Sequence, residues 1–542
     1  MHLLATLLAA SALAQNIPTT GSISGVVRDV GTGTPMTDLE VSANRGSSKA
    51  VDATTDSQGH YEFRGLEAGS YRISVYSKQS FGLSAVRRVT LNAGQELTSI
   101  DLNLRTFGQI SGKVLEENQE PVPGVWVLLV AREYSLGILR HVFASIATTN
   151  DRGEYRIERA EPGRAYLLLA QKKTLKLDAI SNVPANPKLR KRVFVPTYYP
   201  DSNSLDGAQA LVLRIGEHRE GIDIRMSRAL SYCIEGVLEN DRGPAALQFE
   251  IVAQRPTSGI LGNGGMYIAS PAGESGPDGK IRLCELPPGA YRITVSRPGM
   301  GNKAAPAFFG TSQVTIADED VRKVRLSARA QLPVPGEVVW DNTPPDQPVT
   351  SKLSILLMPM SRAFYMGEST EVKSAIPGEF SFPGLLVDEY AINLSGTPSG
   401  LYVKDITYAG SSVLREPLRV GSAIGNAALR IVLARDGCTL KATVADKDGH
   451  PVPDSHVLIL PASATTEASL AAAFLSGRTD QNGAYTSAAL APGKYYVLAT
   501  TAPVDRSPES IDKLWQARLK AKEVDLAPGT SLPLTLVPGS LE

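Results

Sequence analysis

Apolar and polar residues alternate in short runs along this chain, and the runs recur as a repeated phrase. The clearest copy spans residues 56–75, where Tyr61, Phe63, Tyr71 and Ile73 alternate with polar residues. A period of two places alternate side chains on opposite faces of a strand. The Asp-x-x-Gly step before the first run and the Ala-Gly step before the second are typical of turns. The phrase therefore predicts two antiparallel strands with one buried face.

Four more copies of the phrase indicate that the chain is built from repeated units. An opening strand and a central strand precede each copy, and a closing hairpin follows most of them, so a unit has about seven short strands. Units of this kind form β-sandwiches. The further copies span residues 151–163, 278–295, 378–392 and 482–497. The predicted domains are 20–104, 105–229 with a spacer, 230–328, a degenerate 329–435, and 436–542 with a short helix.

Three motifs within these units resemble the carboxypeptidase regulatory-like domain. They are Ile-x-Gly-x-Val at 23–27 and 110–114, Asp-x-x-Gly-x-Tyr-x-Phe at 56–63, and Leu-x-x-Gly-x-Tyr-x-Ile at 66–73. The resemblance implies a transthyretin-like, carbohydrate-binding-like β-sandwich, akin to the B-type repeats of collagen adhesins. In that family the module is usually accessory, so no peptidase activity is implied. The resemblance covers residues 20–104, 105–170, 230–296 and 436–500, and it is weakest over 329–395.

The expected fold class is therefore all-β. It is a tandem array of about five transthyretin-like or Greek-key sandwiches, arranged as beads on a string with short linkers. Two segments near the C-terminal end depart from the strand pattern. The Ala-rich segment 465–475 favours a helical insert. The second segment begins with Ser507 as N-cap, followed by Pro and Glu in the first turn. Its apolar residues lie at helical spacing and are expected to pack on the last sandwich: Ile511, Leu514, Trp515 and Leu519.

Charge and targeting features indicate export. The chain has 55 basic and 55 acidic residues, which gives no electrostatic reason to expect a nucleic-acid or membrane-surface partner. The basic run 188–192 is interpreted as a solvated loop. Residues 1–14 are an apolar run that ends in Ala12-Leu13-Ala14, as in a cleaved signal peptide. No later run is long enough to span a bilayer. The expected location is secreted, periplasmic or cell-surface.

The three cysteines fit that location. Cys233 lies beside Ile234 in an opening strand, and Cys284 lies beside Leu283 in a phrase strand. Because the two apolar neighbours are expected to face the core, both cysteines face the other side. A Cys233–Cys284 disulfide is reasonable if the two strands are neighbours. Cys438 falls on a core face and is expected to be a free, buried thiol.

The sequence contains no recognisable catalytic, cofactor-binding or metal-site motif. The histidines are scattered, and no zinc-protease, nucleophile-elbow or phosphate-loop pattern is present. The segment Asp446-Lys447-Asp448-Gly449 resembles the start of a calcium loop but lacks its closing Glu, so a tight turn is the better interpretation. His450 and His456 flank a Pro-x-Pro turn, and a metal there would require both to fold back.

Aromatic side chains remain the candidates for ligand contact, since exposed rings can stack on sugars. Tyr198, Tyr199 and Trp515 are the candidate ligand-binding residues, although packing against a neighbouring sandwich is the main alternative. Trp126 alternates with Val and Leu and is assigned to the core. The leading hypothesis is a non-enzymatic exported protein that binds polysaccharide or acts as an envelope scaffold. The alternatives are a protein-interaction or adhesion module that binds another envelope protein, and an accessory subunit of a separate enzyme.

Overall fold

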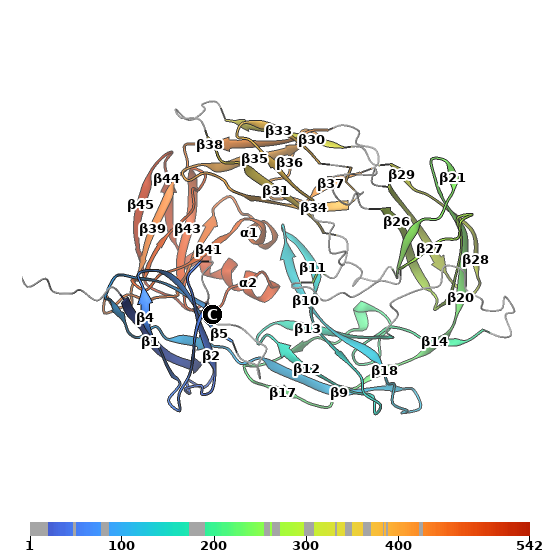
Figure 1. The fold of residues 1–542 in the computed structure, drawn as a ribbon. Helices are drawn as coiled ribbons and strands as arrows, with labels where there is room; N and C mark the ends of the chain where they lie inside the picture. The colour runs from blue at the N-terminus through green and yellow to red at the C-terminus, as the bar shows by residue number, and fades with distance from the viewer. Residues whose placement is uncertain are drawn as a thin grey trace, which may run out of the picture. The chain divides into compact units, whose positions relative to one another are not determined.

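The computed structural model describes residues 20–46, 50–76, 86–172, 190–253, 261–262, 272–297, 308–330, 333–341, 349–360, 370–382, 384–385, 388–421 and 427–541. The predicted signal peptide lies outside these residues. The described part is all-β, with two short α-helices near the C-terminal end (Figure 1). The chain divides into two compact units, Met1–Thr106 and Phe107–Glu542.

The first unit contains one sandwich, named sandwich 1. Along β1, residues that face the core alternate with residues that face outward, as the period of two requires. The two inner faces enclose one apolar cluster that includes Ile23, Tyr61, Phe63 and Ile73. One sheet contains β4 (His60–Glu67), β1 (Thr20–Asp29), β7 (Glu96–Leu97) and β8 (Leu102–Leu104). The other contains β3 (Val51–Thr54), β2 (Glu40–Asn44), β5 (Gly69–Tyr76) and β6 (Val86–Leu91).

Sandwich 2, in the second unit, repeats this plan with one longer hairpin and additional short strands. One sheet contains β12 (Glu154–Ala160), β9 (Gly108–Glu116), β17 (His218–Arg219) and β18 (Ile224–Met226). The other contains β15 (Thr197–Tyr198), β13 (Ala165–Lys172), β10 (Val125–Ser135), β11 (Ile138–Thr148), β23 (Leu261–Gly262) and β16 (Leu211–Val212). A separate ribbon pairs β14 (Arg192–Phe194) with β19 (Arg228–Leu230), and the 3-10 helix η2 covers Leu205–Gly207.

Sandwiches 3 and 4 follow with the same strand order around the opening strand. Sandwich 3 pairs β21 (Gly243–Pro244), β20 (Tyr232–Asn240), β25 (Lys280–Leu286) and β28 (Val321–Ser327) against β24 (Ala272–Glu274), β22 (Gln248–Ala253), β26 (Gly289–Arg297), β27 (Phe308–Ile316) and β29 (Arg329–Ala330). Sandwich 4 pairs β33 (Gly378–Phe382), β30 (Val334–Trp340), β38 (Leu429–Ala434), β35 (Tyr402–Tyr408) and β36 (Ser411–Ser412) against β32 (Thr370–Ser374), β31 (Leu353–Pro359), β34 (Asp388–Ser395) and β37 (Leu418–Val420).

Sandwich 5 carries both α-helices. Its sheets are β42 (Ala484–Thr486), β39 (Thr439–Val444) and β45 (Ser531–Leu536), and β41 (Leu475–Arg478), β40 (His456–Pro461), β43 (Gly493–Thr500) and β44 (Lys522–Leu526). In each sandwich the opening strand pairs antiparallel with the first strand of the phrase and parallel with the last strand or strands. The second strand of the phrase lies in the other sheet, so the two phrase strands do not form a hairpin. This shared pairing brings the two ends of every repeat together in one sheet.

The helices α1 (Glu467–Ala473) and α2 (Pro508–Ala517) confirm the two helical inserts expected from the sequence. Thr466 caps α1 and Ser507 caps α2, each accepting a backbone N–H with its side chain. One expectation about the second insert was wrong: Leu519 lies in the following 3-10 turn η3 (Arg518–Lys520) and is 78% exposed. The α-helix ends at Ala517, so the helical spacing no longer directs position 519 toward the core.

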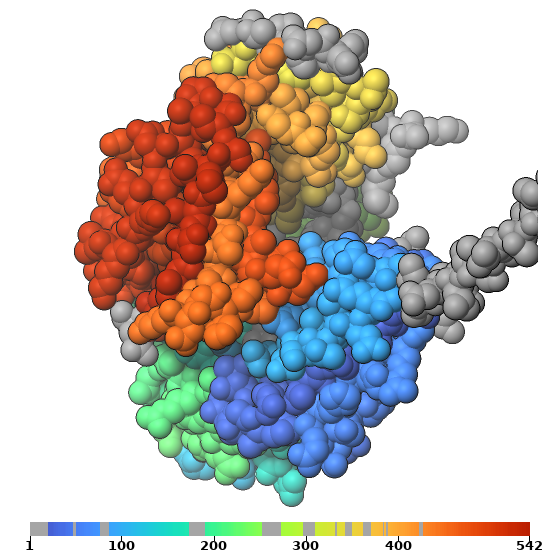
Figure 2. Space-filling model, turned by 90° about the vertical axis from the view of Figure 1, so that its left-hand side faces the viewer, coloured from blue at the N-terminus to red at the C-terminus, as the bar shows by residue number. Residues whose placement is uncertain are grey.

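The central strands of sandwiches 2 and 5 are buried on both faces. In β40, Val457 and Ile459 face the sandwich core, while Leu458 and Leu460 pack under the two helices. Residues of sandwich 5 are coloured orange to red in Figure 2. In β10, the outward Trp126, Leu128 and Val130 pack under residues of the spacer. Trp126 therefore lies in a second apolar cluster and not between the sheets. Among the described residues, no helix has the length and apolar character needed to cross a membrane.

Within the second unit, contacts between sandwiches contradict two expectations: that the basic run 188–192 is a solvated loop, and that the sandwiches are arranged as beads on a string. Arg190 forms an ion pair with Asp320 at 3.1 Å and is only 17% exposed, and Lys191 pairs with Glu285. The described end of the basic run is thus held against sandwich 3 through Arg190 and is not a free loop, while Lys191 and Arg192 are exposed. The sandwiches are also not simple beads on a string. Arg140 of sandwich 2 pairs with Glu389 of sandwich 4 at 2.6 Å, and the β10–β11 hairpin of sandwich 2 also contacts sandwich 5.

Candidate functional site

The glycine in the opening-strand motif lies under a crossing backbone. In sandwich 2, a Cβ atom added to Gly112 would lie 2.0 Å from the carbonyl oxygen of Ile222. Ile222 sits in the interruption between β17 and β18, which both pair with β9. The Tyr155 hydroxyl, from the phrase, donates to the same carbonyl at 2.6 Å and is buried. Both motif residues therefore serve one backbone crossing, because the buried carbonyl needs a donor.

Sandwich 1 contains the same arrangement of glycine, tyrosine and crossing carbonyl, whereas sandwich 5 lacks the glycine. A Cβ at Gly25 would lie 2.2 Å from the Ile100 carbonyl oxygen, and Tyr61 donates to that oxygen. Burial raises the pKa of Tyr61 far above its usual value, so the hydroxyl keeps its proton. In sandwich 5 the last strand β45 pairs with β39 without a register shift, and Ala442 occupies the glycine position. In this pairing the methyl group of Ala442 fits and is buried.

The tyrosine in the second strand of the phrase has an equally structural role. Its hydroxyl reaches back to the backbone carbonyl at the turn that precedes the strand, as a tyrosine corner does in other β-sandwiches. This bond occurs in four sandwiches: Tyr71 to Glu67, Tyr166 to Glu161, Tyr291 to Pro287 and Tyr495 to Ala491. The polar atoms of the repeated tyrosines thus hold the backbone, so the repeat identifies a fold and not a reactive site.

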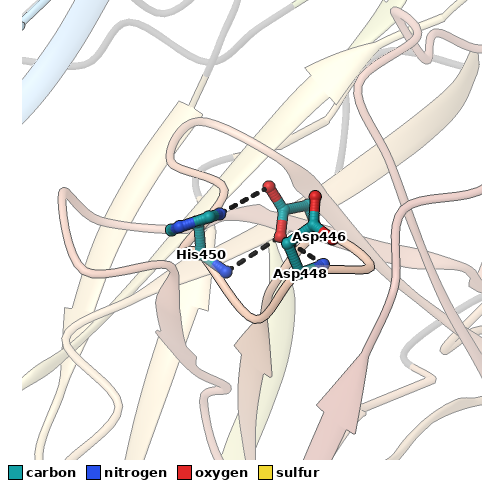
Figure 3. Close-up of side chains that lie close together, drawn as sticks. All are labelled: Asp446, Asp448 and His450. Carbon is teal, nitrogen blue, oxygen red and sulfur yellow. Dashed lines mark hydrogen bonds and ion pairs between the residues drawn. The ribbon is translucent and has the colours of Figure 1, made fainter.

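The turn after β39 is the one place in the described residues where side chains of metal-binding type gather in a group of three (Figure 3). Potential ligand atoms of Asp446, Asp448 and His450 lie within 4.8 Å of one another, and all three residues are exposed. Asp446 Oδ1 accepts the backbone N–H groups of Asp448 at 2.9 Å and His450 at 2.8 Å. Its Oδ2 lies 3.3 Å from His450 Nδ1. These N–H groups lower the pKa of the Asp446 carboxyl.

The same backbone hydrogen bonds are repeated in other turns of the described residues, where no group of three metal-binding side chains gathers. At the start of the phrase in sandwiches 1, 2 and 5, one side-chain oxygen accepts the N–H groups two and four residues later. The residues are Asp56, Asn150 and Asp480. Asp446 therefore acts as a turn residue. His456 is not part of this cluster, since it lies in β40 and its Nδ1 contacts the Ser476 hydroxyl at 3.2 Å.

The proposed sugar-stacking role of Tyr198 is wrong. Tyr198 lies in β15 and has 0% exposure, packed against Trp126 and Leu128. A ring with no exposed surface offers no face to a ligand. The period-two pattern did not reveal this burial, because the covering surface comes from the outer face of β10 in the same sandwich.

Tyr199 and Trp515 are half-buried and lie in different sandwiches. Tyr199 packs against the core of sandwich 2. Trp515, on α2, packs against the outer cluster of sandwich 5, and the Arg518 guanidinium lies 3.1 Å from its ring centroid. One face of the indole is thus already occupied by a cation. Ligand binding by these two residues stays a prediction.

The cysteines occupy two different environments. Cys233 of β20 and Cys284 of β25 are joined in a disulfide, and both residues are buried. They lie at a register shift between the two strands, outside the core cluster of sandwich 3. Cys438 is free, with 0% exposure in the core of sandwich 5, and its thiol lies 3.0 Å from the Ala527 carbonyl oxygen. The disulfide fits an oxidising compartment.

Acid is expected to weaken sandwich 5 through His456. Burial, with a smaller contribution from Arg478, lowers the pKa of His456 from 6.5 to about 4. As the pH falls from 6.5 to 4, the unfolded state takes up a proton that the folded state refuses. The folded state should therefore lose roughly 3 kcal/mol at most. Urea titrations that follow exposure of the Cys438 thiol with an acid-tolerant pyridyl disulfide measure this loss. A His456→Gln variant should show a smaller loss over this pH range, and equal losses in both proteins contradict the assignment.

Comparisons with known proteins find a family match for the first sandwich. No curated protein matches the sequence. Three solved structures have some similarity to this chain, but their identities and TM-scores are too low to indicate its function. A streptococcal ancillary pilin has 12% identity and TM-score 0.20, covering 57% of this chain and 99% of its own. The major pilin subunit BcpA of Bacillus cereus has 11% and 0.16, covering 57% and 99%. The Bacillus anthracis TIE protein has 10% and 0.15, covering 79% and 73%. Residues 22–105, which cover sandwich 1, match the family model of the carboxypeptidase regulatory-like domain.

Proposed function

We propose that this protein is an exported, non-catalytic scaffold that binds its partners through the surfaces of its sandwiches. The observation that supports this proposal is the use of the repeated polar side chains. Tyr155 holds the Ile222 carbonyl, Tyr166 holds the Glu161 carbonyl, and Asn150 holds a turn. Side chains that are committed to the backbone in repeat after repeat build rigid modules, and rigid modules suit display and spacing.

The buried disulfide supports export. Disulfides persist in the periplasm, on cell surfaces and outside cells, and they are rare in reducing cytosol. Fractionation of cells that express the full chain tests this part of the proposal. We expect recovery outside the cytoplasm, an N-terminus at Gln15, and only Cys438 open to thiol reagents after denaturation without reductant. A cytoplasmic chain with three reactive thiols contradicts export.

Two parallel assays on the purified chain, from Gln15 onward, identify the class of binding partner. In the first, soluble and insoluble polysaccharides are tested for saturable retention. In the second, the immobilised chain captures proteins from envelope extracts, with soluble glycans added as competitors. Retention on one glycan that a Trp515→Ala variant loses supports carbohydrate binding. Capture of a defined envelope protein without glycan competition supports the scaffold alone. Turnover of any glycan or peptide by the purified chain contradicts the non-catalytic proposal.

A further inference from the structure

The β10–β11 hairpin of sandwich 2 is unusually long for this fold. Each of its strands has 11 residues, whereas the corresponding β2 and β3 of sandwich 1 have 5 and 4. The hairpin tip, residues 133–138, extends to the helices of sandwich 5, and β10 contacts both α1 and α2 (Figure 1). Sandwich 5 alone among the described sandwiches carries such helices. Two departures from the repeat, far apart in sequence, thus meet at one place, which we name the joint.

The apolar part of the joint is formed by Tyr134 and Gly137. Tyr134 packs against the outer cluster of sandwich 5, which includes Leu470, Phe474 and Leu514. Gly137 has a φ of 75°, and an added Cβ would lie 2.9 Å from the Ala468 carbonyl oxygen in α1. The turn therefore needs glycine both for its backbone conformation and for its close approach to the helix.

Arg506 connects the two helices to the hairpin. Its carbonyl oxygen accepts the Tyr134 N–H at 2.8 Å. Its guanidinium donates to the Ala471 carbonyl in the last turn of α1 at 2.6 Å and lies 4.6 Å from the Phe474 ring centroid. A cation at this end of a helix is favourable because the carbonyls there carry partial negative charge. One residue thus stabilises α1 and holds the tip.

Three charged side chains lie beside the contact between the hairpin tip and sandwich 5. Arg164 of sandwich 2 is 14% exposed and lies 3.4 Å from Glu133 and 3.9 Å from Asp505. Glu133 and Arg164 come from sandwich 2, and Asp505 comes from sandwich 5. Separation of the sandwiches would break the Arg164–Asp505 pair, while Arg164 would keep Glu133 and Glu161, which lies 3.0 Å away in sandwich 2. Charge pairs of this kind specify which surfaces meet.

We propose that the joint is an intramolecular lock that holds sandwiches 2 and 5 of one chain together in solution. The lock covers the outer cluster of sandwich 5 with Tyr134 and leaves the hairpin tip unavailable to other partners. This inference is independent of the proposed scaffold function, because it concerns only contacts within the second unit.

An engineered disulfide tests the lock directly. A Cβ at Gly137 would lie 3.5 Å from the Cβ of Ala472, within the range of disulfides. The variant Gly137→Cys/Ala472→Cys is made in a Cys438→Ala background and oxidised in dilute solution. We expect a crosslinked monomer with a 137–472 linked peptide in mass spectrometry. The control pair is Gly124→Cys/Ala472→Cys. Gly124 lies just before the start of β10, at the opposite end of the strand from the hairpin tip, so this pair should not crosslink. Because position 137 favours glycine, amide exchange in α1 is first compared between the reduced variant and the unmodified chain. Absence of the 137–472 link in a variant with unchanged exchange in α1, or formation of the link only between two chains, overturns the proposal.

Hydrogen exchange gives a second readout that does not depend on new cysteines. Tyr134→Ala should speed amide exchange in α1 by about tenfold, because the helix loses packing that exists only in the locked state. Leu139→Ala is the matched control, since Leu139 lies in the same hairpin and is 41% exposed. Equal exchange in α1 for Tyr134→Ala and the unmodified chain contradicts the lock.

Discussion

Replacement of Gly112 by valine is expected to destabilise sandwich 2 by about 3 kcal/mol or more. The added Cβ would lie 2.0 Å from the Ile222 carbonyl oxygen, which is backbone and cannot rotate away. The β17–β18 crossing would have to move, and its bond from the Tyr155 hydroxyl would be lost with it. Hydrogen exchange of the full chain, read on peptides that cover β9 and β12, measures the loss.

The neighbouring Ser111 provides the control for this substitution. Ser111 lies in the same strand, half-exposed, with its side chain on the outer face. Ser111→Val should change the stability of sandwich 2 by no more than about 0.5 kcal/mol. Equal protection of sandwich 2 in Gly112→Val and Ser111→Val would show that the crossing yields easily, and the structural explanation of the motif would be wrong.

Removal of the Cys233–Cys284 disulfide is the second large effect that we expect. The bond closes a loop with a sequence separation of 51 residues. In the chain-entropy account, the crosslink stabilises the folded state by about 4 kcal/mol. The double variant Cys233→Ala/Cys284→Ala should therefore exchange much faster than the unmodified chain in β20 and β25. Peptides from β39 and β40 of sandwich 5 provide the reference within each sample.

Cys438→Ala separates this effect from the general loss of a buried cysteine. Cys438 is buried in a core but forms no disulfide, so its replacement removes only a small apolar side chain. It should affect sandwich 5 alone, and by less than the disulfide variant affects sandwich 3. A reducing agent should reproduce the double variant in the unmodified chain. Unchanged exchange in sandwich 3 after complete reduction would contradict a stabilising role.

The sequence predicted local structure well where local physics dominates. Ser507 before Pro508 indicated the start of α2, since capping is decided within one turn. Alternation around Tyr61 and Phe63 indicated strands with one buried face, and both residues are buried. The same rule did not predict Tyr198, because a second face was covered by residues from another strand. Helical spacing did not predict that α2 ends before Leu519, because spacing alone does not show where a helix ends.

The candidate sites show the same division. The turn at Asp446-Lys447-Asp448-Gly449 was predictable from its residue types, because its hydrogen bonds span at most four residues. The partners of Arg164, Arg506 and Tyr134 were not predictable, since they join sandwiches 2 and 5 across more than 300 residues of chain. Neither end of such a contact carries a periodic signal.

By itself, the sequence determined that this protein is an all-β chain of repeated sandwiches with helical inserts near its C-terminal end. Periodicity, turn residues and caps act over a few residues, and they are written into the chain at each repeat. Only the tertiary structure decided why the motif needs Gly112 beside Tyr155, which aromatic rings are buried, and which sandwiches touch. These features depend on backbone crossings and surfaces that meet only after folding, so no local pattern records them.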